Sequence, residues 1–168
     1  IYDDQSPEYI MVVVGSGDNS YLVGKMAAFQ MQGLMVAYKE RFDKDNFIKN
    51  LLLDNLLMVD IYSRSQKLHI PMEAKRTVMI VEPVDKKESG LPEAVRACFH
   101  ANGKDFVTAV DENSVVIVKE IAENDSRAEI EKTAAMIKNH LDKEGISRVH
   151  VAYGNIVNEL KEVSRSYK

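Results

Sequence analysis

Acidic side chains at one predicted turn are the first candidates for chemistry in this chain of 168 residues. The turn separates two runs of strand-forming residues, and a further aspartate follows another such run. Carboxylates that meet at one edge of a sheet could hold magnesium ions, which stabilise the attacking and leaving oxygens in phosphoryl transfer. The candidate residues are Asp85, Asp111, Glu112, Asn113 and Ser114.

The composition of the turn speaks against that chemistry. No glycine stands between Ala109 and Ser114, so no position allows the close backbone approach that a triphosphate requires. Aspartate, asparagine and serine are also ordinary turn formers, because their side chains bond to nearby backbone groups. We therefore interpret the turn as structural, and we expect no catalytic residue, no metal and no cofactor.

Other reactive residues lack the neighbours that they would need. Gly15 and Gly17 follow an apolar run, but a dinucleotide site would need a third glycine and a second strand. Cys98 is the single cysteine and is expected to pack as a small apolar residue. The four histidines have no zinc-site spacing; they are His69, His100, His140 and His150.

The apolar periodicity predicts the elements that hold the turn. Strands are expected at Glu8–Val14, Thr77–Val84, on both sides of the turn within Phe106–Ile121, and at Arg148–Gly154. Helices are expected at Ser20–Phe42, Phe47–Leu68, Leu91–Ala101, Ser126–Gly145 and Ile156–Lys168. This order fits two strand-helix-strand units in one antiparallel sheet, an α+β fold of the ferredoxin-like βαββαβ type preceded by long linker helices.

The first two helices carry more apolar surface than one sheet can cover. One face of the first holds Leu22, Met26, Phe29, Gly33 and Val36, and the second is rich in leucine on several sides. A polar break at residues 43–46 allows either a kink or a boundary between them. We expect a homodimer that forms through helices 20–42 and 47–68.

Composition limits the class of protein. A net charge of -4 and a pI near 5.6 argue against a nucleic-acid surface on this chain. No apolar run approaches the roughly 20 residues that span a bilayer, so no membrane contact is expected. A single cysteine fits a cytoplasmic protein.

Four segments resemble one protein family. The segment NFIKNLLLDNLLMVDIYSRSQKLHI, the strand TVMIVEPV, the hairpin VTAVDENSVVIVKE and the strand VHVAYG are similar to the middle region of PucR/CdaR-type transcriptional regulators of purine and sugar-diacid use. The resemblance implies a degenerate GGDEF-like domain at residues 46–168. It also implies that residues 1–45 end a PAS-like or GAF-like sensor domain, and that DNA binds only to a helix-turn-helix domain beyond this chain.

In that family setting, the turn decides between functions. A working diguanylate cyclase carries Gly-Gly-Asp/Glu-Glu-Phe, whereas this chain has Ala109 and Val110 before its carboxylates. The resemblance therefore implies a non-catalytic region that couples a signal to dimerisation. Two alternatives stay open: a minimal nucleotide cyclase that uses Asp85, Asp111 and Glu112, and a small-molecule sensor with a pocket between the sheet and the helix Phe47–Leu68.

Overall fold

The computed structural model describes residues 1–3, 6–15, 17–84, 90–99, 104–111, 114–122 and 126–168. The chain forms two compact units, Ile1–Lys44 and Asp45–Lys168. Helix α1, Asp18–Leu52, is continuous across the boundary between them. The assignment of residues 1–45 to the end of a sensor domain stays a prediction. None of the helices in the described ranges is both long and apolar enough to cross a membrane.

In the first unit, the N-terminal segment lies along α1. The side-chain amide of Gln32 bonds to both backbone groups of Tyr2, accepting from its nitrogen at 2.8 Å and donating to its oxygen at 2.6 Å. Val13 lies against Gly24, where an added Cβ would approach its side chain to 2.8 Å. The expected strand Glu8–Val14 is wrong, because residues 8–15 form no regular structure; two short strands, β1 (Tyr2–Asp3) and β2 (Ser6–Pro7), pair instead.

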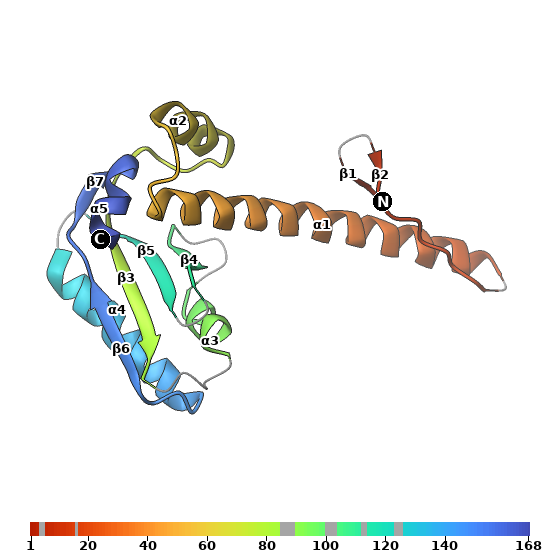
Figure 1. The fold of residues 1–168 in the computed structure, drawn as a ribbon. Coiled ribbons are helices and arrows are strands. Elements are labelled where there is room, and N and C mark those ends of the chain that lie inside the picture. The colour runs from red at the N-terminus through yellow and green to blue at the C-terminus, as the bar shows by residue number, and fades with distance from the viewer. Residues whose placement is uncertain (4–5, 16, 85–89, 100–103, 112–113, 123–125) are drawn as a thin grey trace. The chain divides into compact units, whose positions relative to one another are not determined.

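The second unit is built on one antiparallel sheet (Figure 1). Its strands lie in the order β4-β5-β3-β6, and β7 pairs with the first part of β3. Helix α3 (Leu91–Ala97) connects β3 to β4, and helix α4 (Ser126–Lys143) connects β5 to β6. The mixed α/β fold is as predicted. The strands are β3 (Glu73–Pro83), β4 (Phe106–Ala109), β5 (Val115–Glu120), β6 (Val149–Tyr153) and β7 (Val157–Glu159).

The central strands are buried on both faces. In β5, Val115 and Ile117 pack with α3 and α4, whereas Val116 and Val118 pack on the opposite face. This alternation follows from the two-residue period of a strand. It explains why these strands are apolar at consecutive positions.

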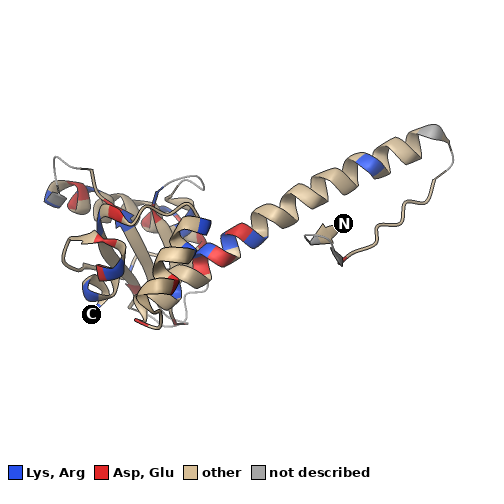
Figure 2. Ribbon diagram, turned by 90° about the horizontal axis from the view of Figure 1, so that it is seen from above, with Lys and Arg blue, Asp and Glu red and all other residues tan. Residues whose placement is uncertain are grey.

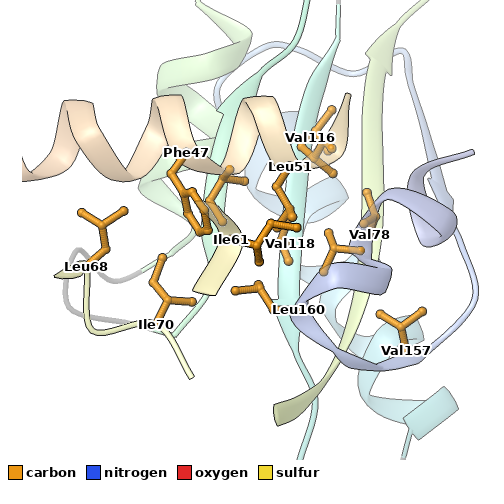
Figure 3. Close-up of a cluster of buried hydrophobic side chains, with 13 residues drawn as sticks. Phe47, Leu51, Ile61, Leu68, Ile70, Val78, Val116, Val118, Val157 and Leu160 are labelled. Carbon is orange, nitrogen blue, oxygen red and sulfur yellow. The ribbon is translucent and has the colours of Figure 1, made fainter. Parts of the chain in front are cut away.

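Two apolar clusters cover the two faces. The α4-side cluster contains Met79, Val81, Leu91, Val95, Val115, Ile117, Ile121, Ile130, Ile137, Leu141 and Ile146. The α1-side cluster, part of which Figure 3 shows, joins the end of α1 to the sheet and to the C-terminal segment. It contains Phe47, Ile48, Leu51, Leu52, Ile61, Leu68, Ile70, Val78, Val116, Val118, Val157, Leu160 and Val163.

The expected helix Phe47–Leu68 is wrong in its continuity. Its first residues end α1, its middle residues 53–57 turn, and its last part is helix α2 (Met58–Lys67). The polar residues 43–46 lie inside α1 and cause no break. The chain turns because Asp54 adopts a left-handed φ of 60°, which lets its amide donate to Leu51 and the amide of Asn55 donate to Asn50.

The expected C-terminal helix Ile156–Lys168 is also wrong in its first half. Residues Val157–Glu159 form β7, a 3-10 turn η1 follows at Leu160–Glu162, and helix α5 occupies only Val163–Tyr167. Pairing of β7 with β3 satisfies backbone groups that a helix would have satisfied internally. The tertiary partner therefore overrides the local pattern.

The remaining elements agree with the predictions, with small shifts at their ends. The hairpin β4–β5, the strand β6 and the helix α4 lie where they were expected, and Pro83 ends β3. Helix α3 ends earlier, at Ala97, and residues 100 and 101 of the predicted helix lie outside the described residues. In the first turn of α4, Glu129 Oε2 accepts the amide of Ala122 at 3.0 Å.

Three helices end in the same way, and one of these ends gives a direct test. After α2, His69 is left-handed with a φ of 55°, and Ile70 donates its amide to Ser65. His69 is exposed, so His69→Gly removes strain without loss of packing. We expect the free energy of unfolding to rise by about 0.5–1 kcal/mol, measured by urea denaturation, because relief of strain exceeds the added entropy of the unfolded chain.

The matched control reverses the change at the end of α4. Gly145 has a φ of 84°, and Ile146 donates its amide to Leu141 in the same arrangement. Gly145→Ala should lower the free energy of unfolding by about 1 kcal/mol. A loss of stability in His69→Gly would show that the left-handed residue is not the determinant of this helix end.

Candidate functional site

The predicted acidic turn closes the β4–β5 hairpin. Asp111 Oδ1 accepts the backbone amide of Ser114 at 2.7 Å, and its Oδ2 accepts the Ser114 hydroxyl at 2.8 Å. Asp111 is exposed, whereas Ser114 is buried. Both carboxylate oxygens of Asp111 therefore hold the turn, as expected for a structural aspartate.

The sheet places this turn beside the end of β3. Ala109 pairs with Val115 across the hairpin, and Val115 pairs with Val81 near the C-terminal end of β3. The hairpin turn therefore lies beside the C-terminal end of β3. Asp85, Glu112 and Asn113 lie outside the described residues, so the structure brings together only Asp111 and Ser114 of the five candidates.

Metal-binding groups do not gather elsewhere in the part of the chain that is described. Within those ranges, no three His, Cys, Asp or Glu side chains are arranged to hold a metal ion. Divalent cations such as magnesium are held by several oxygen ligands. Asp111 therefore has no described carboxylate or imidazole beside it that completes such a set.

Comparison with known proteins gives the chain a family. The sequence profile of the GGDEF-like domain matches residues 55–168, more than half of the chain. This chain belongs to the GGDEF-like domain family. No match to it was found among curated proteins or among solved structures.

A tyrosine of the C-terminal helix enters the neighbourhood of the turn in this GGDEF-like domain. Tyr167 of α5 packs partly buried against the α1-side cluster. Burial raises the pKa of its hydroxyl, and the negative charges of Asp111 and Glu82 raise that pKa further. Sequence patterns did not single out Tyr167, since its approach to residues more than 50 positions earlier depends on the fold.

Among the residues that the structure describes, the most deeply buried charge lies toward the opposite end of β3, and the sequence analysis also missed it. The Arg76 side chain is only 1% exposed; its Nη2 donates to the Pro71 carbonyl at 2.8 Å and lies 3.8 Å from Glu120 Oε2. Lys104 Nζ lies 2.9 Å from the other oxygen of Glu120. Burial lowers the pKa of Arg76, and Glu120 opposes that shift. This ion pair joins β3 to β5 and has a structural role.

The pocket expected for a small-molecule sensor is filled. The space between the sheet and the helices α1 and α2 holds the side chains of the α1-side cluster (Figure 3). A depression of about 470 Å³ lies elsewhere, on the outer surface of α4, and every residue that lines it comes from that helix. These residues are Lys132, Ala135, Met136, Asn139, His140 and Lys143.

Cys98 gives a pH-dependent test of its environment. It packs against the α4-side cluster, with its Sγ 3.6 Å from the Ala94 carbonyl oxygen. Burial raises the pKa of the thiol, because the thiolate loses solvation. We expect alkylation by iodoacetamide to rise with pH around a midpoint above the usual value of about 8.5.

The same measurement in denaturant supplies the control. Unfolding exposes Cys98, so the midpoint should return to that of a free cysteine and the rate at neutral pH should increase. A midpoint below the usual value in the folded protein would instead indicate an activated nucleophile at Cys98.

Proposed function

We propose that this chain is the non-catalytic signal-coupling and dimerisation region of a PucR/CdaR-type transcriptional regulator. The observation that carries the proposal is the double engagement of Asp111 by Ser114 in a turn that has no glycine. A carboxylate used as the acceptor for its own turn is a poor ligand for a metal-bound triphosphate. The order β4-β5-β3-β6, with helices joining alternate strands, supports a sheet of the ferredoxin-like type.

Pairing of two copies through α1 is the first part of the proposal. From Met26 to Tyr38 the helix carries no acidic or basic residue, and Figure 2 shows this part of α1 without charge colour. Large apolar side chains that are exposed to solvent favour association, because association removes their surface from water. The exposed residues are Tyr21, Leu22, Val23, Met26, Phe29, Met31, Leu34, Val36, Tyr38 and Phe42.

A second apolar surface lies on α2 and the turn before it. Its five residues are exposed and lie within ten positions of the chain: Leu53, Leu57, Met58, Val59 and Tyr62. We assign both surfaces to a second copy of this chain. In a two-fold pair, equivalent uncharged surfaces meet without repulsion between like charges.

The arrangement gives the region a mechanical task. A sensor domain that ends with residues 1–45 would change how the two copies of α1 pair. A DNA-binding domain after residue 168 would then change its contacts with DNA. Such a regulator would act in the cytoplasm. Two-fold symmetry of the pair would match the two half-sites of a palindromic operator.

The second candidate is a minimal nucleotide-binding domain. Two observations support it. The chain belongs to the GGDEF-like family, and the acidic turn lies beside the C-terminal end of β3. It would use Asp85, Asp111 and Glu112 as magnesium ligands. The two candidates predict different responses to a triphosphate.

Light scattering on the purified 168-residue chain tests the pairing. We expect a mass of about twice 19.0 kDa in the micromolar range. Phe29→Glu places a charge in the apolar surface and should weaken association at least about tenfold, since an unpaired carboxylate would be desolvated. The control Asn139→Asp adds a charge at an exposed position of α4, outside both apolar surfaces, and should change association less. A monomeric wild-type chain at these concentrations would refute the proposal.

Titration calorimetry with GTP and ATP in magnesium buffer separates the two candidates. We expect no binding heat, because the Asp111 carboxylate is held by Ser114. Asp111→Ala should instead lower the free energy of unfolding by about 1–2 kcal/mol through loss of these bonds. Asp142→Ala removes an exposed carboxylate on α4 and serves as the control. Heat that appears with wild type and vanishes in Asp111→Ala would establish the nucleotide-binding candidate.

A further inference from the structure

We propose that helix α5 is the output element of this region and that the last two turns of α1 set its position. The inference rests on the proposed function, because it names the element through which a change in α1 would reach residues after Lys168. It depends on contacts within the second unit only, where the residues from Asp45 onward belong.

The end of α1 and the C-terminal segment share one apolar cluster. Phe47, Leu51 and Leu52 from α1 are at most 2% exposed, and Leu160 and Val163 are fully buried with them. Figure 3 shows Phe47, Leu51 and Leu160 converging on the same face of the sheet. Close-packed side chains cannot shift singly without opening a void, so a movement of α1 must be followed by its neighbours.

A hydroxyl fixes α5 on the sheet. The amide of Val78 in β3 donates to Ser166 Oγ at 2.9 Å, and Ser166 Oγ donates to the Asn155 carbonyl at 2.6 Å. These bonds fall where β6 has ended and β7 has not yet begun, so Ser166 completes the edge of the sheet. At Gly154 an added Cβ would lie 1.8 Å from the Ser166 carbonyl oxygen. Helix α5 therefore occupies one defined place on β3.

The C-terminal residue also touches the turn that ends α1. Lys168 Nζ lies 3.0 Å from Asp54 Oδ2, and Asp54 is the left-handed residue that stops the helix. Both side chains are exposed, so the pair adds little stability. Its value is positional, because it joins the turn that follows α1 to the residue that follows α5.

The apolar core beneath α4 is separate from this route, and the described contact from the end of α1 to the opposite face is a partly exposed ion pair, in which Arg96 Nη2 of α3 lies 3.2 Å from Asp45 Oδ2. Helices α3 and α4 pack in the α4-side cluster, which shares no residue with the α1-side cluster. The strands β3 and β5 lie between the two clusters. A change at α1 should therefore affect α5 before it affects α4.

Native-state hydrogen exchange followed by mass spectrometry tests the route. Leu51→Ala opens a cavity in the α1-side cluster, and Ile137→Ala opens a similar one in the α4-side cluster, where Ile137 is fully buried. We expect Leu51→Ala to accelerate exchange of amides 163–168 at least about tenfold more than it accelerates amides of α4. Ile137→Ala should show the opposite order.

A milder variant keeps the test decisive if the cavity variants lose their fold. Ser166→Ala removes the hydroxyl bridge and should accelerate exchange of the amides in residues 47–52 as well as those of α5. Ser63→Ala, on the exposed side of α2, is the control and should change neither. If α5 exchanges at the wild-type rate in Leu51→Ala, or if Ser166→Ala leaves residues 47–52 unchanged, the proposal is wrong.

Light scattering on the same samples keeps the two proposals separate. A monomeric wild-type chain would refute the pairing proposed for α1 whatever the exchange pattern. If the chain is a dimer but exchange in α5 does not change with substitutions at the end of α1, only the output role of α5 is refuted.

Discussion

Burial of the strand pair β3–β5 on both faces is the constraint on which the second unit depends. Six consecutive residue pairs join these strands, from Arg76 with Glu120 to Val81 with Val115. Their side chains alternate between two separate apolar clusters. Because each face needs its own helical cover, the unit requires α3 and α4 on one side and the end of α1 with α2 and α5 on the other. The end of the linker helix is thus part of the core rather than an attachment to it.

Sequence periodicity predicted the elements whose partners are local or regular. The run VVIVKE, the strand that ends at Pro83 and the helix α4 follow simple periods, and the structure has them in place. The break before α2 was missed because Asp54 takes a left-handed conformation without the glycine that usually marks such a helix end. In the C-terminal segment, Ile156, Leu160, Val163 and Tyr167 lie at helical spacing, and only pairing with β3 converts its first residues into β7.

Some features of the candidate site could likewise be predicted from the sequence, and others could not. The roles of Asp111 and Ser114 as turn formers could be predicted, since the bonds between them span three residues. The environments of Arg76 and Tyr167 could not be predicted from the sequence. The burial of Arg76 and the approach of Tyr167 to Asp111 both depend on how the chain folds. Hydrogen bonds between residues close in the chain can be predicted from a single sequence, whereas electrostatic interactions between distant segments can be identified only from the fold.

The proposed absence of catalysis is physically compatible with retention of the sheet in this domain. Catalysis with a metal-bound triphosphate needs free carboxylate oxygens and an open backbone, and both are properties of a few turn residues. The stability of the sheet depends instead on apolar clusters and on ladder bonds such as those that Ser166 completes. A turn can therefore have residues that bond to each other in place of glycine, as Asp111 and Ser114 do, without disturbing β3 or β5. Such an exchange would leave the sheet in place with the end of α1 and helix α5 packed in one apolar cluster on the same face, which is the arrangement that the proposed coupling role requires.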